Sequence, residues 1–411
     1  DNGGGTGTIT WTADKKYLIN GFVFVNDGQV LTIEPGTIIQ GKTGQGIQAS
    51  ALIVARGGKI IAEGRPDQPI VFTVEGDDLK GSVPMETSGL WGGLIILGNA
   101  TVNNQSGEAY IEGIPISEPR GIYGGNYDDD NSGILKYVSI RHGGTNIGEG
   151  NEINGLTLGG VGRKTSIEFV EVISNADDGI EFFGGTVNCS KLAVAFCGDD
   201  AFDFDEGYSG KCQFLLGISD PAKGDLLAEH SGASLPASGK PFSHPEISNA
   251  TYVGRTTNPG NYLIHFDENS GGTYKNSIFL NYASGVGIEY ESNGGSFEMW
   301  KNGDLEMEKN IFYNNQDMTS DTILRLFPFN GSLSAEQEVL NLYFLQAGNE
   351  IKNPGFTLED FNYQLLPSNT IFLNMAENNS TWFEKVTYKG AFGSRNWLEG
   401  WSNIWEEGIV R

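Results

Sequence analysis

Short apolar runs separated by glycine-rich turns fill the N-terminal part of the chain. Ala51–Ala55, Pro69–Val74 and Leu94–Leu97 are examples, and sustained helical spacing of apolar residues is missing around them. Such runs predict short β-strands. Strands of this length cannot bury a hydrophobic face alone, so they are expected to stack on copies of themselves.

Two pairs of segments show the spacing of the repeat. Asp178–Phe183 aligns with Asp200–Asp205 at an offset of 22 residues, and Tyr262–Asp267 aligns with Val286–Glu291 at an offset of 24. This spacing suits one coil of a parallel β-helix. Because side chains alternate along a strand, one position of each copy is expected to point inward and the next outward. The inward set is Ile180, Phe202, Ile264 and Ile288, and the outward set is Glu181, Asp203, His265 and Glu289.

Three stretches depart from this pattern. The glycine-rich start, residues 1–8, predicts a flexible tether. Residues 218–248 contain several prolines and predict a loop that projects from the solenoid. In residues 333–411, Ser334 ahead of Glu336 and Glu338 predicts a helix, which together with the tryptophan-rich end would cap the last coil. We therefore expect an all-β chain: a single right-handed parallel β-helix over residues 9–332, with the loop insertion at 218–248 and the cap at 333–411.

The charge of the chain excludes some partners. Its 52 acidic and 26 basic residues give a formal net charge of −26, which is unsuited to binding nucleic acid or an anionic membrane. No apolar run is long enough to predict a transmembrane segment. Three cysteines are too few for a disulfide framework. Cys189 and Cys212 lie about one coil apart, which leaves open either one bond between neighbouring coils or buried free thiols.

Several motifs resemble those of a known group of proteins. Leu90–Asn99, Ser139–Gly144 and Ser174–Gly185 are similar to segments of secreted and cell-surface β-helix repeat proteins of Bacteroidota. The resemblance implies an extracellular protein or one at the outer-membrane surface, either a surface lipoprotein or type IX secretion cargo. A lipid-anchoring Cys would then precede Asp1. It also implies a surface partner, such as a TonB-dependent transporter complex.

The outward column is the strongest candidate for chemistry. Neighbouring coils lie about 4.8 Å apart, so stacked carboxylates repel one another unless they are protonated or bound to a cation. Three interpretations stay open: a Ca²⁺ site, a general acid and base acting on a glycosidic bond, and a solvated polar face. The residues expected to bind a ligand, such as a glycan, are Glu181, Asp203, His265, Glu289, Asp267 and Glu291.

A weaker likeness concerns catalysis. Asn175–Glu181 and Gly198–Asp203 resemble the paired acidic motifs of polygalacturonase-type β-helix hydrolases. Carried over, the catalytic residues would be Asp177, Asp199 and Asp200. The Gly-His-Gly and Arg-x-Lys motifs of that family do not follow Asp200, so a uronate carboxylate has no evident cationic anchor. We therefore expect binding of a glycan or an envelope protein rather than turnover, with a polyuronate hydrolase or lyase as the alternative.

Acidic residues are densest between positions 177 and 205. The coil register is expected to gather Asp177, Asp178, Glu181, Asp199, Asp200, Asp203 and Asp205 into one patch. Oxygen ligands without nearby cysteine or histidine pairs favour Ca²⁺ over zinc or copper. The sequence therefore predicts a Ca²⁺ site there.

Overall fold

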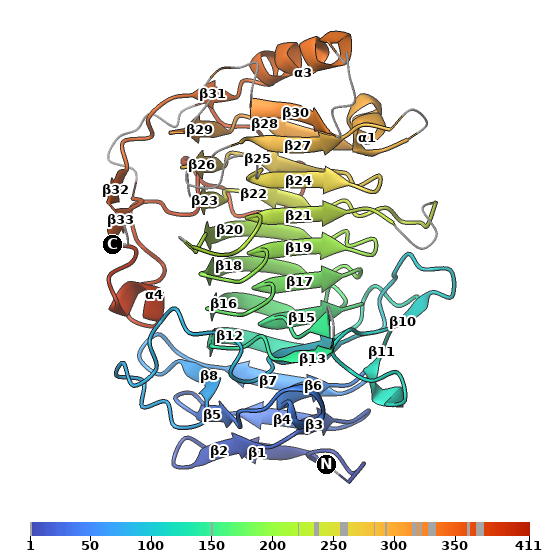
Figure 1. Ribbon diagram of the computed structural model, residues 1–411, viewed down its shortest axis with the longest axis vertical. Helices are drawn as coiled ribbons and strands as arrows, with labels where there is room; N and C mark the ends of the chain where they lie inside the picture. The colour runs from blue at the N-terminus through green and yellow to red at the C-terminus, as the bar shows by residue number, and fades with distance from the viewer. Residues whose placement is uncertain are drawn as a thin grey trace.

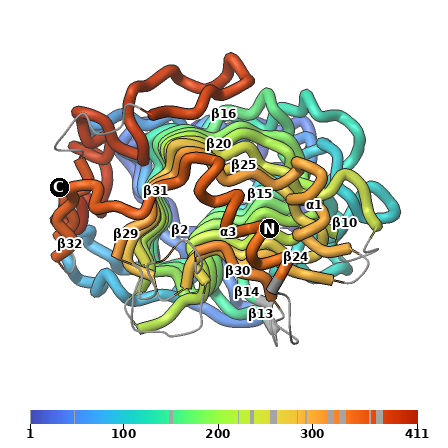
Figure 2. Tube along the Cα trace, turned by 90° about the horizontal axis from the view of Figure 1, so that it is seen from above, coloured from blue at the N-terminus to red at the C-terminus, as the bar shows by residue number. Residues whose placement is uncertain are grey.

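Two long parallel sheets surround a common apolar interior (Figure 1). The computed structural model describes residues 2–148, 151–220, 222–233, 238–254, 262–282, 284–291, 294–314, 319, 323–327, 334–359, 362–366 and 374–411. Seen along the long axis, successive coils lie over one another and the C-terminal segment lies outside them (Figure 2). The predicted parallel β-helix is confirmed.

Sheet B contains one strand from each coil and carries the candidate site. Its strands are β3 (Phe22–Val25), β6 (Ala51–Val54), β9 (Leu94–Leu97), β15 (Leu156–Gly159), β17 (Ile180–Phe183), β19 (Phe202–Asp205), β21 (Ala228–Ser231), β24 (Ile264–Asp267), β27 (Val286–Glu289) and β30 (Leu324–Phe327).

Sheet A contains the other strands of the coils, two of which run together in β12, β16, β18 and β20. Its strands are β1 (Ile9–Trp11), β2 (Lys16–Ile19), β4 (Val30–Ile33), β5 (Ile38–Gly41), β7 (Lys59–Glu63), β8 (Ile70–Val74), β12 (Gly133–Arg141), β16 (Ser166–Ile173), β18 (Asn188–Ala195), β20 (Lys211–Ile218), β22 (Glu246–Ser248), β23 (Thr251–Val253), β25 (Gly272–Lys275), β26 (Ile278–Leu280), β28 (Leu305–Glu308), β29 (Ile311–Tyr313) and β31 (Glu350–Ile351).

Smaller elements decorate the solenoid. They are the pairs β10 (Glu108–Tyr110) with β11 (Ile122–Gly124), β13 (Asn146–Gly148) with β14 (Asn151–Glu152) and β32 (Thr357–Glu359) with β33 (Asn362–Gln364), the helices α1 (Ser296–Asn302), α3 (Ser334–Gln346) and α4 (Asn403–Glu406), and two short 3₁₀ turns at Gly46–Gln48 and Pro119–Gly121.

Residues at equivalent positions of successive coils form stacked columns in the core. Ile180, Phe202 and Ile264 are fully buried, as expected. A second inward column stacks aromatic rings: Phe182 on Phe204 at 5.0 Å, Phe204 on His230 at 4.8 Å, and His230 on Phe266 at 4.3 Å between ring centroids. These columns make the interior continuous along the solenoid.

The structure confirms one register and corrects the other. Glu181 pairs with Asp203, which is the predicted offset of 22 residues. His265, however, pairs with Gly287 rather than Glu289, because β24 and β27 are also 22 residues apart and not 24. A slip of two residues leaves every side chain on the same face of the sheet, so the alternation of apolar and polar residues did not reveal it.

Two stretches expected to lie outside the solenoid belong to it. Within residues 218–248, β21 pairs with β19 and β24 and adds a full position to sheet B, while residues 221 and 234–237 lie outside the described part. Residues 3–7 are not a free tether: the N–H of Thr6 donates to the Phe24 carbonyl at 2.8 Å, and that of Gly7 donates to Gln29 Oε1 at 3.0 Å. Both stretches therefore extend the β-helix.

The C-terminal region does not cap the last coil as a whole. The predicted helix is present as α3 and lies over the end of the solenoid, but the following chain returns along its outside as far as β12 and β16 (Figure 1). There Trp401 packs edge-on against Tyr137 at 5.7 Å and against Phe169 at 6.4 Å. The tryptophan-rich end, which was expected to cap the last coil, therefore covers an aromatic side face of the middle coils.

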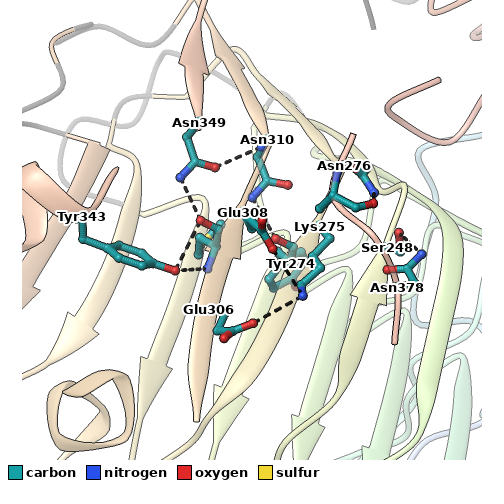
Figure 3. Close-up of polar contacts among 12 residues, drawn as sticks. Ser248, Tyr274, Lys275, Asn276, Glu306, Glu308, Asn310, Tyr343, Asn349 and Asn378 are labelled. Atoms are coloured by element: carbon teal, nitrogen blue, oxygen red, sulfur yellow. Dashed lines mark hydrogen bonds and ion pairs between the residues drawn. The ribbon is translucent and has the colours of Figure 1, made fainter. Parts of the chain in front are cut away.

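Asparagine side chains bind successive turns to one another. Asn281 and Asn314 adopt positive φ and are hydrogen-bonded to each other through their side chains. In another column, Asn310 donates to the Tyr274 carbonyl at 2.9 Å, and Asn349 accepts from the Asn310 N–H at 3.0 Å (Figure 3). These bonds satisfy backbone groups that the turns leave unpaired.

Candidate functional site

The outer face of sheet B changes character along the solenoid. Over the N-terminal coils it is apolar, and Ile53, Ile95 and Leu97 are buried beneath Ile111 and Tyr123 of the segment that carries β10 and β11. From β17 onward the same outward position is occupied in turn by Glu181, Asp203, Glu229 and His265. The change places carboxylates directly beside the edge of the covering segment.

Three carboxylates at this edge form a buried triad. Asp178, Glu181 and Asp203 each contribute one oxygen to a group whose members lie within 4.8 Å of one another. Their exposed fractions are 8%, 7% and 8%. Asp178 lies in the turn that precedes β17, and one of its oxygens accepts the Asp200 N–H at 2.8 Å. The stacking of successive turns therefore brings Asp178 next to the strand positions above it.

The triad is linked to two further groups, the first through Asp178 and the second through Asp199 of the first. Asp177, Asp178 and Asp199 form one group, and Asp199, Asp200 and Asp225 form another. We call the six predicted residues within these groups the acidic patch: Asp177, Asp178, Glu181, Asp199, Asp200 and Asp203. Asp205, the seventh predicted cation ligand, belongs to none of these groups, and its Oδ1 instead accepts the Glu206 N–H at 2.5 Å.

Burial makes these carboxyl groups hard to ionise. Loss of solvation, followed by repulsion from Glu112 and Asp203, raises the pKa of Glu181 well above its ordinary value. For Asp203 the same loss of solvation, followed by repulsion from Glu229 and Asp205, also raises the pKa well above the ordinary value. Burial with repulsion from Glu112 raises the pKa of Asp177 to about 7. A patch of this kind holds either protons or a cation near neutral pH.

One oxygen of the triad receives no hydrogen bond from the described part of the protein. Asp203 Oδ1 is buried and has no hydrogen-bond partner in the described part of the chain. None of the ion pairs found among the described residues involves a member of the acidic patch. A buried carboxylate oxygen without a donor is costly unless the group shares a proton with its neighbour Glu181 or a cation occupies the space in front of it. The donor set, carboxylate oxygens alone, fits a hard divalent cation.

A second group lies further along the same face. Glu229, His265 and Asp267 lie within 4.8 Å of one another, with His265 Nδ1 3.8 Å from Glu229 Oε1 and 3.7 Å from Asp267 Oδ2. The His265 ring also stacks on Phe327 at 3.8 Å. Glu289 belongs to the row of Asp267 rather than that of His265, and Glu291 is exposed beyond the end of β27. The predicted ligand-binding residues therefore do not form one column.

The three predicted catalytic residues differ in access. Asp177 is half-buried and Asp199 is exposed, whereas Asp200 is 3% exposed. Asp200 Oδ1 accepts the Leu226 N–H at 2.6 Å, so part of this carboxylate is engaged by the backbone. Asp177 and Asp199 are thus the members of the trio that a large substrate can reach.

Three acidic residues of the site were not predicted. Glu112 comes from the covering segment and accepts a hydrogen bond at 2.9 Å from Asn154, whose amide also contacts Glu181. Glu206 accepts a 2.5 Å hydrogen bond from the Tyr123 hydroxyl. Glu229 follows Asp203 in the outward column. Glu229 would have been found by recognising β21 as a strand, but no local pattern announces the contact of Glu112.

The comparison with known families bears on this geometry. The profile of the family described as the pectate-lyase like beta helix domain matches residues 3–355. The chain belongs to this family. Searches of curated proteins and of solved structures give no significant match. The match covers both sheets and the acidic patch, so the patch lies within the pectate-lyase-like β-helix domain, while α4 and the segment around it lie beyond the matched region.

Among the described helices, none is both long and apolar enough to cross a membrane. The two cysteines expected on neighbouring coils, Cys189 and Cys212, pair in register between β18 and β20 and are buried free thiols. The chemistry of the domain therefore concentrates on its carboxylates.

Proposed function

We propose that this pectate-lyase-like β-helix domain is a binding protein that holds a Ca²⁺ ion in the buried triad and acts outside the cell. The observation that carries the proposal is the unpartnered, buried Oδ1 of Asp203 beside the carboxylates of Asp178 and Glu181. Ca²⁺ accepts six to eight oxygen ligands in flexible geometry, and the acidic patch supplies carboxylate oxygens from two neighbouring coils.

The ion would act as a clamp between coils. Asp178 and Glu181 belong to one coil and Asp203 to the next. Without a cation the carboxyl groups must hold protons, because their charges repel in a buried setting. Replacing those protons by Ca²⁺ removes the repulsion and links the two coils, so the ion stabilises the native state selectively.

Thermal unfolding of the full chain tests this site. Added Ca²⁺ should raise the midpoint of unfolding relative to EDTA, by about 2.7 kcal/mol of stability at a hundredfold excess over the dissociation constant. Asp203→Asn should abolish the response, and Asp67→Asn, at an exposed position outside the patch, should leave it unchanged. Equal midpoints in EDTA and in millimolar Ca²⁺ would contradict the proposal.

The partner is proposed to be a glycan or another protein of the cell envelope. Support comes from the resemblance to Bacteroidota surface proteins and from the long faces of a solenoid, which suit extended ligands. Protease treatment of intact source cells tests the location, because a surface protein should be cleaved before any periplasmic marker. Copurification with an outer-membrane transporter would identify the partner class.

A polysaccharide-degrading activity is the second candidate. One observation favours it: half-buried Asp177, whose pKa burial raises to about 7, lies beside exposed Asp199, whose pKa burial also raises, so the two carboxyls can share a proton. Incubation with polygalacturonate, alginate and neutral glycans tests it. New reducing ends or unsaturated products that disappear in Asp177→Asn would establish the enzyme, and their absence would leave the binding function.

A further inference from the structure

A long groove follows the outside of the C-terminal coils, on sheet A rather than on the acidic face. It consists of three adjoining cavities of about 560, 290 and 440 Å³. The first and second share Gly303 and Glu306, and the second and third share Asn378 and Phe383. We call these three adjoining cavities together the C-terminal groove. Its length suits an extended chain better than a single small molecule.

Aromatic rings line the first end of the groove. Trp300 of α1 stacks on Phe297 at 5.3 Å with an angle of 23° between the ring planes, and Tyr343 of α3 meets Trp300 edge-on at 5.4 Å. The Met307 N–H donates to the Tyr343 hydroxyl at 2.9 Å, which fixes that ring. Trp300 and Tyr343 are both partly exposed, so this end offers a rigid aromatic wall.

The floor of the middle section is polar, and its lysines are paired with glutamates, which outnumber them. Lys275 Nζ lies 3.4 Å from Glu306 and 3.3 Å from Glu308 (Figure 3). Glu246 forms its own ion pair with Lys211 at 2.6 Å. Thr273 lies between these charged side chains in the groove. The floor therefore offers hydrogen-bonding groups without a strong demand for a charged ligand.

The far end of the groove is formed by the C-terminal segment. Asn378 is held on sheet A by a 3.1 Å hydrogen bond to Ser248 (Figure 3). The Glu384 N–H donates to Gln213 Oε1 at 2.8 Å. These contacts fix residues 375–386 as a wall, so the groove does not need the segment to move before a ligand can enter.

We infer that the C-terminal groove binds an uncharged oligosaccharide. A pyranose ring packs its C–H face on aromatic side chains and directs its hydroxyl groups sideways, which matches an aromatic wall that continues into a polar, charge-paired floor. A polyuronate would bring a row of carboxylates to a floor whose lysines are already paired with glutamates. The inference rests on the glycan-binding part of the proposed function and is independent of the Ca²⁺ site.

Calorimetric titration of the full chain tests the inference with four uncharged hexasaccharides, built from glucose, xylose, mannose or N-acetylglucosamine, and with polygalacturonate for comparison. At least one hexasaccharide should bind, and EDTA should not weaken it. Trp300→Ala should lower the affinity at least tenfold. Thr273→Trp, which fills the middle of the groove without touching the aromatic wall, should do the same. Tyr127→Ala removes an exposed ring elsewhere and should have no effect.

The outcomes separate this inference from the Ca²⁺ proposal. If no hexasaccharide binds, or if polygalacturonate alone binds, the groove assignment is wrong even when Ca²⁺ raises the melting temperature. If a hexasaccharide binds but Asp203→Asn abolishes binding while Trp300→Ala and Thr273→Trp do not, the glycan site lies on the acidic face and the groove is again excluded. Folding of each variant is checked by its circular dichroism spectrum and melting curve.

Discussion

At the scale of single residues, two kinds of buried ionisable group change the stability of the protein in opposite directions as the pH rises. His230 is fully buried between Phe204 and Phe266, with its Nε2 3.0 Å from the Tyr274 hydroxyl. Burial lowers its pKa well below 6.5. The carboxyl groups of the acidic patch have pKa values shifted upward for the same reason. Each shift predicts a slope of stability against pH.

His230 should make the protein sensitive to acid. Below a pH of about 6.5 the unfolded chain binds a proton at this position and the folded protein does not, so the stability that the neutral ring contributes is lost as the pH falls. We predict that His230→Phe, which continues the aromatic column, removes up to about 1.4 kcal/mol of this loss per pH unit. Urea unfolding at pH 7 and pH 5 measures the difference, and equal slopes in both proteins would refute the prediction.

The acidic patch should have the opposite effect in EDTA. Burial raises the pKa of Asp177 from 3.8 to about 7 and raises those of Glu181 and Asp203 well above their ordinary values, so the folded protein holds more protons than the unfolded chain between the ordinary and the raised values. Stability should therefore fall as the pH rises from about 5 to about 8. Ca²⁺ should flatten this slope and stabilise most at the alkaline end. Unfolding curves with parallel slopes in EDTA and Ca²⁺ would argue against a cation in the patch.

At the scale of elements, the sequence predicted the strands whose motifs recur along the chain and missed the strand and the tertiary contact that have no repeated motif. The strand pairs around Glu181 and Asp203 were predictable, because identical motifs recur at a fixed spacing. β21 was missed because glycines and prolines flank a single short run, and the 24-residue offset was wrong because pattern alone tolerates a slip of two. The six carboxylates of the acidic patch were foreseen in this way, whereas Glu112 reaches the patch through a tertiary contact that has no local signature.

One such tertiary contact holds α4 to the side of the solenoid. Glu171 of β16 is fully buried and accepts hydrogen bonds from Ser402 Oγ at 2.6 Å and from the Asn403 N–H at 2.9 Å. We predict that Glu171→Ala destabilises the protein by roughly 3 kcal/mol, since buried donors lose their acceptor. Glu168→Ala on the same strand removes only a partly exposed ion pair with Lys136 and should cost less than about 1 kcal/mol.

Chemical denaturation measures both variants, and limited proteolysis reports where they loosen. Glu171→Ala should be cleaved within the C-terminal segment earlier than the unaltered protein or Glu168→Ala. Equal stability of the two variants would mean that aromatic packing alone fixes α4.

At the scale of the whole molecule, the returning C-terminal segment changes how a solenoid unfolds. In a simple repeat protein each coil contacts its neighbours only, so stability is a sum of local terms. Here residues 391–410 bury Phe392, Leu398 and Trp401 against coils from the middle of the chain. Contacts between distant coils should make unfolding more cooperative than stacking alone would.

Removal of residues 374–411 tests this role. The truncated chain should lose roughly 5 kcal/mol or more, since several large apolar side chains no longer leave water. It should also expose Tyr137 and Phe169, bind a hydrophobic dye and unfold over a broader range of denaturant. A truncated protein with an unchanged midpoint and no dye binding would show that the segment is only an appendage.

The late position of the returning segment in the sequence also determines how long the aromatic side face stays uncovered during synthesis. Glu171 and Ser402 are 231 positions apart, so the aromatic side face of the middle coils is complete long before the segment that covers it has been made. At translation rates of about 5–20 residues per second, that face stays open for roughly 10–50 s. During this time the apolar face of each newly made chain is exposed, and a chaperone can bind it. Only a chain translated as far as residues 391–410 can cover this face.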